Sequence, residues 1–151
     1  MRVEQELERM GLTLSDPPAV PVGSFVPAVQ LDKIVFVSGA TGARFFEFRG
    51  KLGRDLTVEQ GYEAAKFAMV GCLSNLKQTL GDLDRVERIV KLLGFINAAD
   101  GFTDTPRVLN GASDLLLQLY GENGQHARSA IGVAALPGNA PVEVEMIVAV
   151  K

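Results

Sequence analysis

Residues 125–150, QHARSAIGVAALPGNAPVEVEMIVAV, decide the fold class of this chain. They contain two runs, 126–135 and 142–150, separated by the connection LPGNAP, and the second run alternates apolar residues with Glu143 and Glu145. Runs of this kind bounded by Pro and Gly predict β-strands. Because the connection is short, we expect the two strands to pair with each other as a hairpin.

The chain before this stretch alternates predicted strands and helices. Strands are expected at about residues 25–30, 33–39 and 85–97. Helices are expected at residues 2–10, 58–80 and 106–120. The second helix carries the clearest signals, because Thr57 and Gln60 have the spacing of a capping box and Gly81 follows as a stop. We interpret residues 1–151 as a single domain, with residues 1–19 as a short helix and linker that extend it.

The order of elements predicts an α+β fold in which the two main helices cover one face of a sheet. The strand at 85–97, RVERIVKLLGFIN, has apolar residues on both alternating positions, which indicates cover on both faces. Two helices cannot cover both faces of such a sheet. We therefore expect another subunit to cover the second face.

Composition excludes several classes of function. The chain has 151 residues, a net charge of -3, one histidine and one cysteine, Cys72. The mild acidity and scattered basic residues argue against nucleic acid as a partner. The single thiol and the charged N-terminus suggest the cytoplasm, and no apolar run is long enough for a membrane. We expect no metal and no cofactor, since no ligand cluster, P-loop or nucleophile elbow is present.

Candidate chemistry gathers on the two closing strands. Arg128 shares a strand face with His126 and Ala130, and small residues beside an arginine leave room for a bound carboxylate. On the other strand Glu143 and Glu145 share a face. Arg128 beside a glutamate of its hairpin partner can be a structural ion pair or part of a binding site, and the pattern alone favours the ion pair. His126, with no evident partner, is interpreted as a surface or interface residue.

The segment ARSAIGVAALPGNAPVEVEM resembles the C-terminal signature of the RidA/YjgF family, and its arginine-serine pair, Leu-Pro turn and alternating glutamates fall in matching order. Two earlier segments, VFVSG and GKLGRDLTVEQGYEAAK, also match the family, and they fall in the family's order. The resemblance covers about residues 20–150. It is nearest to the longer branch labelled endoribonuclease L-PSP or chorismate-mutase-like.

This resemblance implies a chorismate-mutase-like fold and a homotrimer whose sheets form a central barrel, with three sites in clefts between subunits. Family members hydrolyse enamines and imines such as 2-aminoacrylate to a 2-keto acid and ammonia. The family's carboxylate-binding arginine falls on Arg128 and its water-positioning glutamate on Glu143. Ser38 and Asn110 match further substrate-binding positions.

Departures from the family pattern reshape the expected pocket. A tyrosine near the N-terminus is replaced by Phe25, a cysteine two residues after the arginine by Ala130, and a glutamine after Ser-Gly by Ala40. Besides the hydrolysis of small 2-imino acids by a deaminase, three alternative functions therefore remain open. They are a non-catalytic trimeric binder of small carboxylates or keto acids, an endoribonuclease and a chorismate mutase.

Overall fold

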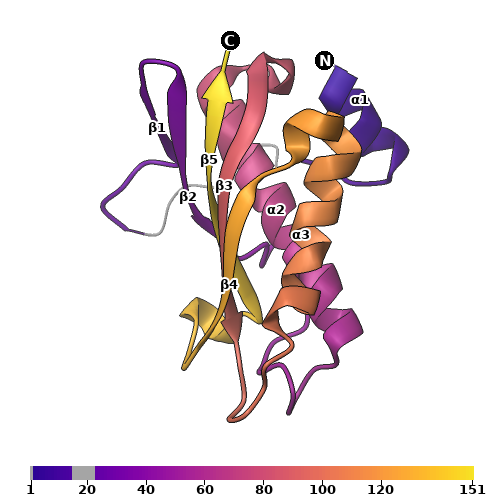
Figure 1. Cartoon of the computed structure of the whole chain (residues 1–151). Coiled ribbons are helices and arrows are strands. Elements are labelled where there is room, and N and C mark those ends of the chain that lie inside the picture. Colours follow the sequence, from indigo (N-terminus) through magenta and orange to yellow (C-terminus); the bar gives the residue numbers. More distant parts are fainter. Residues whose placement is uncertain (1, 15–22) are drawn as a thin grey trace.

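The computed structural model describes residues 2–14 and 23–151, and it has the expected α+β architecture (Figure 1). The linker expected before residue 19 falls largely on residues 15–22, which lie outside the described residues. The main elements are α1 (Arg2–Arg9), β1 (Ala28–Leu31), β2 (Ile34–Ala40), α2 (Val58–Leu80), β3 (Val86–Asn97), α3 (Thr105–Tyr120), β4 (Ala127–Val133) and β5 (Val142–Val150).

The expected helix signals act as predicted. Thr57 accepts a hydrogen bond from the Gln60 amide at 3.2 Å, and the Gln60 side chain accepts one from the Thr57 amide at 2.9 Å. Gly81 ends α2 with φ 81, a left-handed conformation that glycine adopts without strain. In α3, Pro106 stands in the first turn, where its missing N–H is not needed.

The expected pairing of the two closing strands is wrong. The sheet has the order β1-β2-β5-β3-β4, so β3 lies between β4 and β5. β4 runs parallel to β3 along residues 91–97, whereas β5 is antiparallel to both β3 and β2. The residues from 134 to 141 therefore cross over the end of β3 instead of closing a hairpin. A side chain explains the detour, because the buried Asn97 at the end of β3 donates to the Ala140 carbonyl at 3.2 Å.

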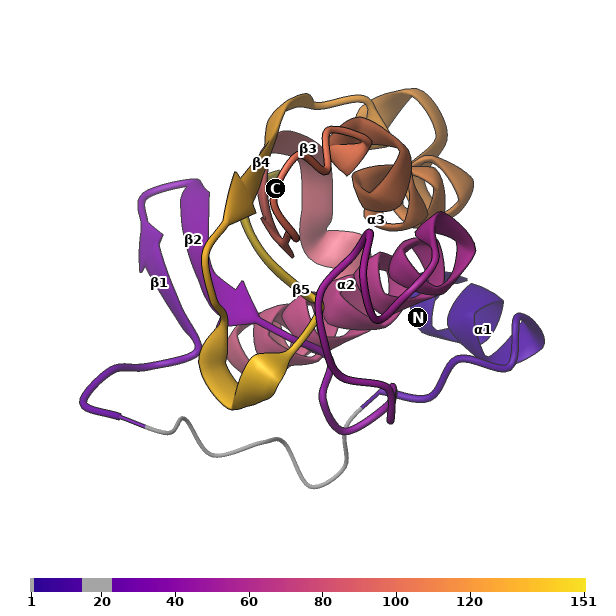
Figure 2. The same cartoon turned by 90° about the horizontal axis from the view of Figure 1, so that it is seen from below.

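Among residues 2–14 and 23–151, helices cover only one face of the sheet (Figures 1 and 2). α2 and α3 pack on the face that carries Leu92, Val144 and Val148, all fully buried. The opposite face is exposed and apolar, and we call it the open face. Four of its large apolar side chains, Val29, Leu31, Phe36 and Ile131, are 45% to 66% exposed. The alternation that predicted two covered faces therefore leaves one face without cover in this chain.

Candidate functional site

A shallow depression lies between α3 and the start of β4, and we call it the arginine pocket. Its volume is about 290 Å³. Its lining residues are Asn110, Ser113, Asp114, Leu117, Gln125, His126 and Arg128. Three of the expected site residues, Asn110, His126 and Arg128, are thus brought together.

Neutral groups hold Arg128 in this pocket. Its Nη1 donates to the Ser113 hydroxyl at 3.0 Å and its Nη2 donates to the Pro106 carbonyl at 3.1 Å. Within residues 2–14 and 23–151 no carboxylate forms a salt bridge with Arg128. The structural ion pair with a glutamate, favoured by the pattern alone, is therefore wrong. A guanidinium with neutral partners keeps its charge available for an anionic ligand.

His126 has partners that the sequence did not indicate. Its Nδ1 lies 2.6 Å from the Gly124 carbonyl and its Nε2 lies 2.9 Å from the Ser113 hydroxyl. A carbonyl only accepts, so Nδ1 carries the proton and Nε2 of the neutral ring accepts from Ser113. Ser113 in turn accepts from Arg128. Hydrogen bonds therefore run in one direction from Arg128 through Ser113 and His126 to Gly124, and they orient the guanidinium.

The remaining expected residues gather where β2 meets β5 on the open face, and we call this group the glutamate face. The half-buried Glu143 lies beside Gly39, where a Cβ would come within 2.9 Å of its Oε2. The Ser-Gly pair at the end of β2 is therefore explained, since any larger residue at position 39 would displace the carboxylate. Burial, and then the neighbouring Glu145, raise the pKa of Glu143.

Ser38 connects the end of β2 to the segment before β1, which contains Phe25. The Ser38 hydroxyl donates to the Val26 carbonyl at 2.7 Å, and the Ser38 amide donates to the Pro27 carbonyl at 2.9 Å. Phe25, one residue before Val26, is 51% exposed. The family's tyrosine position is thus an uncovered phenyl ring in this chain.

The arginine pocket and the glutamate face do not meet within one chain. Arg128 pairs with Leu92 on β3, and Glu143 pairs with Phe95 on the same strand. Positions three apart on a strand face opposite sides, and the hydrogen bonds of Arg128 to α3 confirm that it points to the helix side. Ala130 follows Arg128 on the helix side, and its carbonyl accepts from Thr105 at 3.0 Å.

Sequence reasoning missed Ser113 and Asp114. Both lie on α3 at three and four residues from Asn110, the spacing that places side chains on one helix face. Asp114 accepts a hydrogen bond from the Tyr62 hydroxyl of α2 at 2.7 Å, which, as the largest cause, raises the pKa of Tyr62 to about 12. The helical period around Asn110 would have identified both residues.

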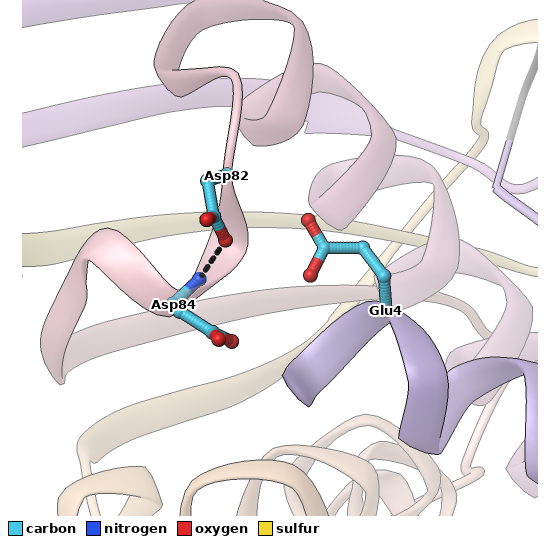
Figure 3. Close-up of side chains that lie close together, drawn as sticks. All are labelled: Glu4, Asp82 and Asp84. Atoms are coloured by element: carbon cyan, nitrogen blue, oxygen red, sulfur yellow. Dashed lines mark hydrogen bonds between the residues drawn. The ribbon is translucent and has the colours of Figure 1, made fainter. Parts of the chain in front are cut away.

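Three carboxylates gather away from these groups, near the start of β3 (Figure 3). Hydrogen bonds of Glu4 and Asp84 attach α1 to the rest of the chain. Glu4 accepts from the Leu83 amide at 3.0 Å, Asp82 accepts from the Asp84 amide at 2.8 Å, and Asp84 accepts from the Arg2 and Val3 amides. Burial opposes ionisation of Asp84, but hydrogen bonds at the start of α1 outweigh it and lower its pKa. We interpret the cluster as structural.

Comparisons with known proteins agree with the fold. The model of the family described as "YjgF/chorismate mutase-like, putative endoribonuclease" matches residues 6–149. Protein TCP17 of Trypanosoma cruzi is 42% identical over 150 residues, which cover 97% of this chain and 93% of that protein. Within the described residues, no helix is long and apolar enough to cross a membrane.

Two solved structures are similar along nearly the whole chain. A protein of unknown function from Agrobacterium tumefaciens is 35% identical with a TM-score of 0.88, covering 98% of this chain and 91% of that one. A protein from Shewanella oneidensis named as an endoribonuclease is 31% identical with a TM-score of 0.91, covering 98% and 99%. From the family model and these relatives, the chain belongs to the YjgF/chorismate-mutase-like family.

Proposed function

We propose that this protein hydrolyses small 2-imino acids to 2-keto acids and ammonia. The observation that carries the proposal is Arg128, a cation held by neutral partners in an open pocket with no salt bridge to any described residue. A guanidinium in this state binds a planar carboxylate through two parallel hydrogen bonds. The carboxylate of an imino acid would thereby be fixed against the wall formed by α3 and β4.

Glu143 would supply the proton chemistry. In the reaction a water oxygen adds to the imine carbon, the C=N π electrons move to nitrogen, and the resulting carbinolamine expels ammonia as the carbonyl forms. A carboxylate whose pKa is raised towards neutral is a better base for taking the water proton. It can return that proton to the leaving nitrogen. No cofactor is required, because a conjugated imine is already electrophilic.

Assembly is part of the proposal, because Arg128 and Glu143 point to opposite sides of one sheet. The open face exposes the large apolar side chains of Val29, Leu31, Phe36 and Ile131, and exposed apolar side chains on one face are typical of a surface that another protein chain covers. A homotrimer that buries this face would set the arginine pocket of one copy beside the glutamate face of the next. Three equivalent clefts follow from threefold symmetry. Because a single cysteine allows no disulfide within the chain, we place this assembly in a reducing compartment, the cytoplasm.

Imine turnover tests the activity. We would generate 2-aminoacrylate and a panel of larger 2-imino acids in situ and follow the formation of each keto acid, with the Arg128→Ala variant as control. Acceleration by the wild type that is lost in the variant supports a deaminase. No acceleration across the panel, from folded protein of trimeric mass in sedimentation, would favour the non-catalytic binding of carboxylates. A monomeric mass would contradict the proposed assembly.

A further inference from the structure

The arginine pocket contains a second charge that the proposed reaction does not yet use. Asp114 lines the same depression as Arg128, and both residues are placed by α3. Among the described residues Asp114 forms no salt bridge, with Arg128 or with any other cation. A cation and a carboxylate that share one small pocket without pairing are complementary to a ligand that carries both charges in the opposite order.

The position of Asp114 is set by a second helix. The Tyr62 hydroxyl of α2 donates to Asp114 Oδ2 at 2.7 Å, and the raised pKa of Tyr62 keeps this hydroxyl a donor throughout the physiological range. Within the part of the chain that the structure describes, this is the only hydrogen bond of the Asp114 side chain. Its Oδ1 is therefore available to a donor in the pocket, and the Tyr62 contact limits how far the carboxylate can turn.

We propose that Asp114 selects ligands that combine a carboxylate with a positively charged nitrogen. Arg128 would bind the carboxylate, and Asp114 would face the nitrogen. Asn110, one helical turn before Asp114, adds an amide that can donate or accept between them. Plain carboxylates and keto acids satisfy Arg128 alone and leave Oδ1 of Asp114 without a donor.

This selection rests on the proposed function and deepens it. The nitrogen of an imino acid is a better electron acceptor when protonated, because the C=N π electrons then move to a cation as water adds to carbon. A carboxylate beside the nitrogen stabilises this iminium form and so raises the fraction of bound substrate that water can attack. Asp114 would exchange no proton and form no bond in this step. The neutral keto group of the product loses the interaction, which favours product release.

Alanine and lactate test the selection, because they share a carbon skeleton and a carboxylate but carry an ammonium group and a hydroxyl, respectively. Dissociation constants for both would be measured by titration calorimetry on the wild type and on Asp114→Asn, which keeps an oxygen for Tyr62 and removes the charge. Asp104→Asn is the matched control, since Asp104 starts the same helix and pairs with Arg107 outside the pocket. Arg128→Ala reports on the carboxylate anchor.

The wild type should prefer alanine to lactate, and Asp114→Asn should reduce that preference by about two- to fivefold, the range for a solvent-exposed ion pair. Asp104→Asn should leave it unchanged. If Asp114→Asn leaves the preference unaltered while Arg128→Ala weakens the binding of both ligands, the role of Asp114 is overturned. Arg128 would in that case still bind the carboxylate. Binding of both ligands that survives Arg128→Ala would remove the anchor and with it the proposed function. Absence of saturable binding by the wild type would also overturn the selection.

Discussion

The arginine pocket and the glutamate face differ in how far one chain completes them. Arg128 lies in a pocket whose walls come from its own chain, and a buried serine and a histidine orient it through hydrogen bonds. Glu143 lies half-buried on a face that no described helix covers, and it forms no hydrogen bond with any described residue. In the proposed reaction, one chain would therefore complete the binding pocket, whereas the surroundings of Glu143 would need a second subunit on the open face.

The largest expected effect separates chemistry from binding. Glu143→Gln keeps the size of the side chain and removes the base, so kcat for imine hydrolysis should fall by about 10²- to 10⁴-fold. The affinity for a non-reacting carboxylate should stay within about twofold, because Arg128 is untouched. Steady-state kinetics and calorimetry on the same preparation measure both. Full activity of the variant would remove Glu143 from this role.

Replacement of Arg128 should mainly lower the affinity for carboxylates. Arg128→Ala removes charge-assisted hydrogen bonds to the ligand, so carboxylate affinity should fall by about 10- to 100-fold. Arg9→Ala is the matched control, because Arg9 is an exposed arginine of α1 paired with Glu6. Titration of each variant with the same carboxylate gives the comparison. Equal affinities in the two variants would show that Arg128 is not the anchor.

Gly39→Ala should affect the glutamate face alone. The added Cβ would lie 2.9 Å from Oε2 of Glu143, closer than such atoms approach, so the flexible carboxylate must shift. We expect kcat to fall by about tenfold, as for a modestly misplaced catalytic group, with carboxylate affinity unchanged. A loss of affinity that equals the loss of kcat would contradict the separation of the two halves.

The smallest effect concerns stability. Because burial raises the pKa of Glu143 above its ordinary value near 4.5, the unfolded chain gives up this proton first as pH rises. The ionised carboxylate therefore costs the folded wild type stability above that pH. Between pH 4 and pH 7, the Tm of Glu143→Gln should rise relative to that of the wild type by about 1 °C. The difference is small because solvent screens a half-exposed group. Calorimetric scans across this range measure both Tm values. A rise in the Tm of the wild type relative to the variant would contradict the prediction.

Local sequence signals predicted the helices and strands of the fold, but they did not predict which strands pair with each other. The capping box at Thr57, the stop at Gly81 and the alternation along residues 142–150 each act within a few residues, and each is confirmed. The order of strands depends on contacts far apart in sequence, such as Asn97 with Ala140, which no short-range pattern encodes. A short Pro- and Gly-containing connection suggested a hairpin because hairpins are the commonest outcome of such connections.

The same limit applies to the site. Arg128 and its small neighbours predicted an open position on a strand, whereas Asn110 was expected at the site only from the family resemblance. Ser113 reaches Arg128 only because α3 packs across β4, and His126 contacts Ser113. Their part in orienting Arg128 could therefore not be predicted from spacing along the strand. The wrong hairpin also placed Glu143 beside Arg128, on the same side of the sheet.

Subunit complementation tests the central claim, that a site joins Arg128 of one copy to Glu143 of another. Chains with Arg128→Ala and Glu143→Gln, each inactive alone, would be co-expressed with different tags, and mixed trimers isolated through both tags. Every mixed trimer in a threefold ring has one of its three clefts with both residues intact, so imine hydrolysis should return to about a third of the wild-type rate. Mixed trimers no more active than the two parents would contradict the account.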